Sequence, residues 1–99
     1  MSAEVLDRPE ITTLSEERIE EDFPWQVIIF NDEAHTFDEV IFQIQKATGA
    51  ALQAAFEITM EIHTQGKAIC FEGSLTQCER VANILREISL SVEIVPAGE

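Results

Sequence analysis

The chain has 99 residues, of which 45% are hydrophobic, and its 19 acidic and 6 basic residues give a net charge of −13 at pH 7. A chain of this length forms one small domain with a single core and at most a shallow surface pocket. Six cations are too few to neutralise a phosphate backbone or to bind an anionic membrane, so we expect neither nucleic acid nor a membrane as a partner. The sequence has no secretory signal pattern and no apolar run of about 18 residues, and we therefore expect a cytoplasmic protein.

The segment 1–23 differs in composition from the rest of the chain. It is rich in Glu, Ser and Thr, it carries two pairs of adjacent glutamates at 16–17 and 20–21, and it has no periodic apolar face. Such a segment cannot bury enough apolar surface to fold by itself. We expect a flexible acidic N-terminal extension at 1–23 and a folded domain at 24–99.

The folded part is predicted to begin with a strand and a helix. The run from Trp25 to Phe30 is β-branched and aromatic, which is typical of a buried strand, and it stops at turn-forming residues. Thr36 and Glu39 have the spacing of a capping box, which predicts the start of a helix there. Gly49 is a natural end for that helix.

The remaining elements follow from the same kind of pattern. A second helix is expected over about 50–64, with Leu52 and Phe56 on its apolar face, and Gly66 ends it. A strand over 67–72, a helix opened by a capping box at Ser74, and an alternating strand from Leu90 complete the chain. The order is β-α-α-β-α-β, an α+β domain with a three-stranded sheet and three helices packed against one of its faces.

The sequence offers no catalytic constellation. It contains no HExxH motif, no paired-cysteine spacing for zinc and no GxGxxG loop. Cys70 and Cys78 fall within a predicted strand and a predicted helix, and we expect both to be buried and reduced. We therefore predict a binding protein without a metal or cofactor, not an enzyme.

One polar corner stands out. Asn31 and Asp32 follow the first strand, and His63 lies in the last turn of the second helix, which the predicted helical hairpin returns toward the end of that strand. An amide oxygen, a carboxylate and a neutral imidazole nitrogen all accept hydrogen bonds, a set that suits an ammonium group beside apolar neighbours. Spacing alone leaves a second interpretation open, in which Asn31-Asp32 is only a turn and His63 only a helix cap.

Two motifs at a characteristic distance add a family resemblance. The first runs from Val27 to Glu33 and reads VIIFNDE, and the second runs from Glu61 to Cys70 and reads EIHTQGKAIC. Together they resemble ClpS, a family of adaptors of the bacterial Clp protease. The resemblance implies recognition of N-degrons, which are N-terminal Leu, Phe, Tyr or Trp residues, and delivery of such proteins to the ClpA unfoldase, which feeds the ClpP protease. It further implies a monomer.

The resemblance also implies roles for individual residues. Asn31, Asp32 and His63 would hold the α-amino group of the substrate. The hydrophobic pocket would be lined by Ile29, His35, Phe37, Val40, Thr59, Ile62 and Leu90. Thr76 and Arg80 on the third helix would contact the unfoldase, and the acidic extension would engage it during delivery.

Some positions depart from the family pattern, and a second resemblance competes with the first. Thr59 stands where the pattern has a Met at the pocket entrance, and Phe37 is bulkier than the usual Met at its position, so the preferred side chain is expected to differ. The β-α-α-β-α-β order also resembles the C-terminal domain of the ribosomal stalk protein, which is a docking module without an amine pocket. Peptides that differ only in their first residue distinguish the two.

Overall fold

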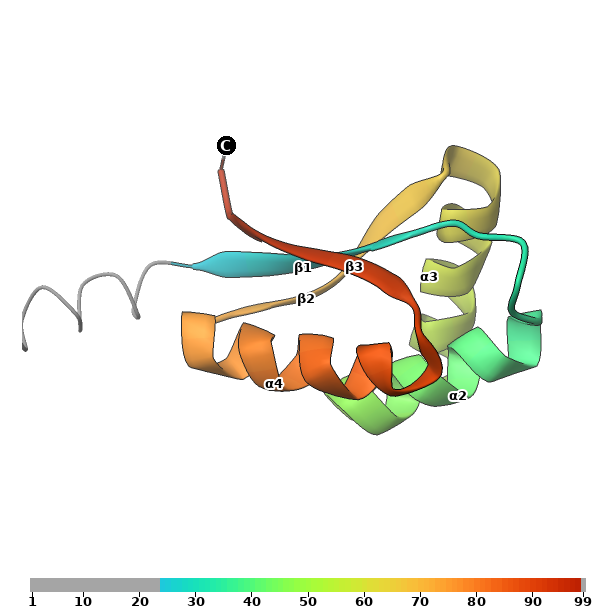
Figure 1. Ribbon diagram of the computed structural model, residues 1–99, viewed down its shortest axis with the longest axis horizontal. Helices are drawn as coiled ribbons and strands as arrows, with labels where there is room; N and C mark the ends of the chain where they lie inside the picture. The colour runs from blue at the N-terminus through green and yellow to red at the C-terminus, as the bar shows by residue number, and fades with distance from the viewer. Residues whose placement is uncertain (1–23, 99) are drawn as a thin grey trace, which may run out of the picture.

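The computed structural model describes residues 24–98, so the extension expected at 1–23 lies outside the described residues. The elements appear in the predicted order, with one short 3₁₀ helix, η1, added directly after the third α-helix (Figure 1). In chain order they are β1 (Trp25–Phe30), α2 (Phe37–Thr48), α3 (Leu52–Gln65), β2 (Lys67–Gly73), α4 (Leu75–Leu85), η1 (Arg86–Ile88) and β3 (Ser91–Pro96).

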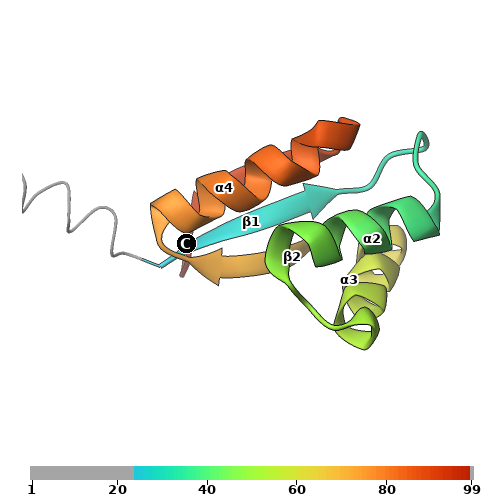
Figure 2. The ribbon, with the colours of Figure 1, turned by 90° about the horizontal axis from the view of Figure 1, so that it is seen from below.

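The three strands form one antiparallel sheet in the order β2-β1-β3, with β1 in the centre. All three α-helices lie on the same side of this sheet, as Figures 1 and 2 show from two directions. Val27 and Ile29 of β1 point toward the helices and are fully buried against a core that includes Ile44 and Leu85. The opposite face is open, since Ile69 of β2 is 48% exposed. The predicted α+β architecture is confirmed.

The helix boundaries follow the local signals in the sequence. The Thr36 hydroxyl accepts a hydrogen bond from the Glu39 N–H at 3.1 Å, and the Glu39 carboxylate accepts one from the Thr36 N–H at 2.8 Å. Ser74 and Gln77 make the same reciprocal pair at the start of α4. Both predicted capping boxes are therefore present, and each satisfies backbone donors that the first helical turn leaves unpaired.

The apolar face predicted for α3 is wrong in part. Leu52 is 60% exposed and Phe56 is 41% exposed, whereas Ala55 and Ile62 are buried. The reason is that α3 packs mainly against α2 and β2, so that the side of the helix turned away from both remains in solvent. Helical spacing predicted a wide apolar face for α3, but the structure buries the part of that face that is turned toward α2 and β2.

Cys70 and Cys78 are both buried and neither forms a disulfide, as predicted. Burial in apolar surroundings raises the pKa of Cys70 to about 12, so its thiol is not ionised at neutral pH. Within residues 24–98, no helix is long and apolar enough to span a membrane.

We expect the two capping hydroxyls to contribute measurably to stability. Thr36→Ala and Ser74→Ala should each lower the free energy of unfolding by about 1 kcal/mol, because each leaves one backbone N–H at a helix start, that of Glu39 or of Gln77, without its acceptor. Urea denaturation measures this. Thr64→Ala is the matched control, since its hydroxyl bonds only the Met60 carbonyl of its own helix. Cap variants as stable as Thr64→Ala would contradict the assignment.

Candidate functional site

The loop after β1 is attached to the end of α3 through the backbone. The N–H of Asn31 donates a 2.9 Å hydrogen bond to the carbonyl of Gly66. Gly66 ends α3 with φ at +88°, a conformation that residues with a Cβ rarely adopt, and the chain reverses there into β2. His63 lies one helical turn earlier. The first polar residue after β1 is thus brought next to the last turn of α3, as the sequence predicted.

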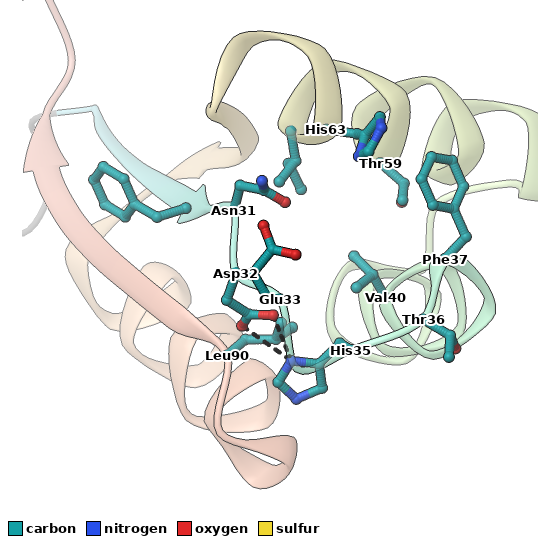
Figure 3. Close-up of a pocket in the computed structure, with 12 residues that line it drawn as sticks. Asn31, Asp32, Glu33, His35, Thr36, Phe37, Val40, Thr59, His63 and Leu90 are labelled. Carbon is teal, nitrogen blue, oxygen red and sulfur yellow. Dashed lines mark hydrogen bonds and ion pairs between the residues drawn. The ribbon is translucent and has the colours of Figure 1, made fainter.

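A pocket of about 190 Å³ opens between this loop and the two helices. The end of β1, the 31–36 loop, α2, α3 and Leu90, which directly precedes β3, all contribute to its wall (Figure 3). The lining residues are Phe30, Asn31, Asp32, Glu33, His35, Thr36, Phe37, Val40, Thr59, Ile62, His63 and Leu90.

The polar groups of the pocket divide into two sets. In Figure 3 the side chains of Asn31 and Glu33 point into the space below His63, whereas the Asp32 carboxylate turns away toward His35. Among the described residues, no hydrogen bond engages the side chains of Asn31, Glu33 or His63. These three side chains therefore offer free acceptors at one end of the pocket.

Asp32 is held by its own loop. Its Oδ1 accepts a hydrogen bond from the Ala34 N–H at 2.9 Å, and both carboxylate oxygens lie 3.0 Å from Nδ1 of His35. Partial burial acts to raise the pKa of Asp32, but the hydrogen bonds from His35 and Ala34 outweigh it and leave this pKa below its usual value. The hydrogen bond to Asp32 is also the main reason why the pKa of His35 lies above its usual value.

The rest of the wall is apolar. Val40, Ile62 and Leu90 are almost fully buried. The Phe37 ring packs edge-on against His63, with 5.5 Å between ring centroids, and against Phe56 at 6.4 Å. These separations and tilts are typical of favourable aromatic pairs. The aromatic ring of Phe37 therefore forms one side of the entrance, next to the free acceptors.

Thr59 contributes little polarity to the pocket. Its hydroxyl donates to the Ala55 carbonyl of the preceding helical turn at 2.8 Å, and the residue is 3% exposed. A hydroxyl that bonds its own helix is not available to a ligand. At this position the side chain is short and effectively apolar, which makes room that a longer side chain would fill.

The structure brings together nearly all the residues that the sequence predicted for the site, with two corrections. Ile29 does not line the pocket, because its side chain is fully buried in the core on the inner face of β1, and the next residue, Phe30, lines the pocket instead. Asp32 lines the pocket, but its carboxylate is engaged by His35. The carboxylate that lies near the side chains of Asn31 and His63 is that of Glu33. The sequence held a signal for this, since an Asp at the start of a turn commonly bonds the backbone two residues later.

Thr76 and Arg80 lie apart from the pocket. They are exposed residues one turn apart on α4, and α4 contributes no residue to the pocket lining. Within residues 24–98, no group of three or more metal-ligating side chains is present. The fold and the site thus define a small domain with a compact pocket, polar at one end and apolar along its wall, and with a separate exposed helix face.

Comparison with known proteins identifies the family. Residues 20–93 match the family of the ATP-dependent Clp protease adaptor protein ClpS, and the chain therefore belongs to this family. This confirms the predicted adaptor of the Clp protease, and it favours the ClpS resemblance over that to the ribosomal stalk protein. It also agrees with the prediction that the chain is not an enzyme.

Individual relatives cover most of the domain. The ATP-dependent Clp protease adapter protein ClpS of Corynebacterium glutamicum strain R is 28% identical over 89 residues, which are 90% of this chain and 85% of that protein. The ClpS of Rhodococcus opacus strain B4 is 29% identical over 84 residues, 81% of this chain and 72% of that protein. The structure of Agrobacterium tumefaciens ClpS2 bound to L-phenylalaninamide has a TM-score of 0.71 at 15% identity, with 76% of this chain and 98% of that chain covered, which shows a shared fold.

We expect the Asp32–His35 pair to make stability depend on pH. The pKa of His35 is raised in the folded state, so its contribution is complete below the unfolded value of about 6.5 and is lost as pH rises through the folded value. The pKa of Asp32 is lowered, so its contribution is present above about 3.9 and is lost as pH falls through the folded value.

The free energy of unfolding of the protein and of the His35→Gln variant should therefore differ most between pH about 4.5 and 6.5, and less toward pH about 9. Urea titrations across this range measure the difference. Glu87→Gln serves as a control, because it removes a neighbouring charge that pairs with Lys46 and not with His35. A difference that grows with alkaline pH would contradict the direction assigned to His35.

Proposed function

We propose that the pocket binds the free N-terminal residue of a substrate protein, a bulky hydrophobic N-degron, and that this chain delivers such substrates to a ClpA-type AAA+ unfoldase working with the ClpP protease in the cytoplasm. The observation that carries this proposal is the pairing of free acceptors with an adjoining apolar wall in one small pocket. The N-terminus of a protein is the one place in a chain where an ammonium group and a side chain are attached to the same carbon.

The polar end of the pocket is suited to an ammonium group. Such a group has three N–H donors and no acceptor, so it requires acceptors only. The amide oxygen of Asn31, the carboxylate of Glu33 and a ring nitrogen of neutral His63 supply three, from two elements that the Asn31–Gly66 hydrogen bond holds together. In this proposal Glu33 takes the position that the sequence suggested for Asp32, because Asp32 is engaged by His35.

The apolar end is suited to a single side chain. An apolar cavity of about 150 Å³ is known to hold a benzene molecule. The pocket, at about 190 Å³, therefore has room for one phenyl or isobutyl group beside the ammonium group. The Agrobacterium protein of the same fold binds L-phenylalaninamide, which carries a free amine and a phenyl ring on neighbouring carbons, and this supports the same class of ligand here.

The expected affinity is moderate. Two hydrogen bonds to a charged group contribute roughly 3–6 kcal/mol, and burial of a Phe or Leu side chain adds about 1.5–3 kcal/mol. Micromolar binding corresponds to a net free energy on the order of −8 kcal/mol, which is near the upper end of this sum before the cost of association, so we expect micromolar affinity at the tightest. An adaptor must release its substrate to the unfoldase, and micromolar affinity permits rapid dissociation.

Delivery requires a second contact that leaves the pocket open. The exposed face of α4 with Thr76 and Arg80 is the surface that we assign to the unfoldase, because none of its residues lines the pocket. Substrate and unfoldase can then be bound at the same time. In this proposal the acidic segment 1–23 acts as the extension that engages the unfoldase during transfer.

We expect binding to depend on the free amine and on the first side chain. Fluorescent peptides that begin with Phe or Leu should bind with micromolar affinity, and the same peptides with an acetylated N-terminus should not bind measurably. Acetylation removes the positive charge and two of the three donors. Fluorescence polarisation provides the measurement, and a peptide beginning with Gly is the control for the apolar part. Equal binding of free and acetylated peptides would favour a docking surface without an amine pocket.

Two charge-matched variants locate the carboxylate that binds the amine. Glu33→Gln should weaken binding of the Phe peptide about tenfold or more, because it replaces an ionic acceptor with a neutral one. Asp38→Asn removes the same charge from the exposed first turn of α2, outside the pocket lining, and should change affinity much less. An equal effect of the two variants would indicate long-range attraction alone and would remove Glu33 from the site.

The short side chain at position 59 should set the range of accepted residues. Thr59→Met fills part of the apolar end with a longer, flexible side chain. We expect the variant to lose affinity for peptides that begin with the largest side chains, Trp and Tyr, relative to those that begin with Leu. Competition with unlabelled peptides measures the ranking. An unchanged ranking would show that Thr59 does not contact the bound side chain.

A further inference from the structure

His35 connects two parts of the site that are distant in sequence. Its Nδ1 lies 3.0 Å from both carboxylate oxygens of Asp32, and its Nε2 is hydrogen-bonded to the backbone carbonyl of Ile88, 53 residues along the chain. Only 11% of the His35 side chain is exposed. One imidazole ring therefore joins the loop that carries the candidate ammonium ligands to the end of η1, just before β3.

Both partners of the ring are acceptors. The Ile88 carbonyl has no proton to donate, and the Asp32 carboxylate already accepts a third hydrogen bond, from the Ala34 N–H. A neutral imidazole has a single N–H, whereas an imidazolium has one on each nitrogen. The two contacts of His35 can therefore form together only when both ring nitrogens carry a proton.

The charge of the imidazolium is balanced locally by Asp32. Other charged groups surround the ring, but each is engaged elsewhere or faces the pocket. The Glu39 carboxylate accepts from the Thr36 N–H, Glu87 pairs with Lys46 at 2.9 Å, and Arg86 donates to the Val92 carbonyl at 3.1 Å. Glu33 and His63 face the pocket instead (Figure 3). Asp32 and His35 thus form a pair with no net charge at the edge of the site.

We propose that His35 is a positioning residue of the ammonium site: its doubly protonated ring engages the Asp32 carboxylate and ties the loop to η1, so that Glu33 is the carboxylate presented to the substrate. The inference rests on the proposed function for its ligand, but the hydrogen bonds that carry it exist without a substrate. When the ring loses a proton at alkaline pH, it retains one N–H and can keep only one of its two partners. The loop then loses one attachment, and Asp32 loses its counter-charge.

Asp32→Asn tests this arrangement because, in the variant, His35 can make the same contacts without a second ring proton. An Asn at this position can accept from the Ala34 N–H through its oxygen and donate through its amide nitrogen to Nδ1 of a neutral His35, while Nε2–H keeps the Ile88 carbonyl. All three hydrogen bonds then persist without the imidazolium. If His35 acts as proposed, the variant keeps the loop in place at a pH at which the natural protein does not.

The measurement is the affinity for a Phe-initial peptide at pH about 6.5 and about 9, for the natural protein and for Asp32→Asn. The ratio of the two affinities at each pH cancels the ionisation of the peptide amine, which is common to both. We expect affinities within about threefold at the lower pH and a ratio that moves at least threefold in favour of the variant at the higher pH. Asp38→Asn, which removes an equal charge from α2, should show a constant ratio.

Two outcomes would overturn the proposal while leaving the proposed function intact. A loss of about tenfold or more for Asp32→Asn at both pH values would mean that Asp32 itself binds the ammonium group. Ring ¹⁵N chemical shifts that show a neutral His35 at pH about 6.5 in the natural protein would mean that the two contacts are not made by an imidazolium.

Failure of the proposed function has a different signature. If neither protein binds the Phe peptide under any condition, both the proposed function and the positioning role are overturned. The His35 ring ¹⁵N chemical shifts of the substrate-free protein then still show whether the ring is an imidazolium. An imidazolium would indicate an Asp32–His35 pair with a structural role alone, and a neutral ring would indicate that this ion pair is absent. A supporting result combines the pH-dependent ratio with an imidazolium in the natural protein and a neutral ring in Asp32→Asn.

Discussion

The hydrogen bond from the Asn31 N–H to the Gly66 carbonyl is the interaction on which the geometry of the site depends. It extends the pairing of β1 with β2 by one residue, beyond the last strand pair of Phe30 with Lys67. Because Gly66 both ends α3 and begins the reversal into β2, this single contact sets the distance between the loop after β1 and the last turn of α3. The side chains of Asn31 and His63 therefore face one space without any direct bond between them.

The one-sided sheet determines where the two proposed partners bind. All three helices cover the same face, but α2 and α3 pack against each other near the end of β1, while α4 runs along the sheet (Figure 2). The pocket forms between these two helices and the loop, and the exposed face of α4 contributes no residue to the pocket lining. In a domain with a single small core, this separation allows the same molecule to hold a substrate at one end and an unfoldase along a helix.

The electrostatics of the site are more selective than the overall charge of −13 suggests. Exposed acidic residues attract a cationic group over a distance, but salt screens this attraction within roughly 10 Å. In the proposed function, binding at short range depends on which carboxylate is free to accept from the ammonium group. The contact of His35 with Asp32 withdraws one carboxylate from the pocket, and Glu33 remains.

The sequence by itself determined the elements, their order and most of the site. Capping boxes at Thr36 and Ser74 and the glycine at Gly66 act within a few residues, so their effect is readable locally. The two motifs around Asn31 and His63 identified the family and the residues that meet in the pocket. What only the tertiary structure decided was direction: that Phe30 and not Ile29 lines the pocket, that Leu52 and Phe56 face solvent, and that the Asp32 carboxylate turns to His35. These choices depend on contacts between residues far apart in the chain, such as that of His35 with Ile88, 53 positions along.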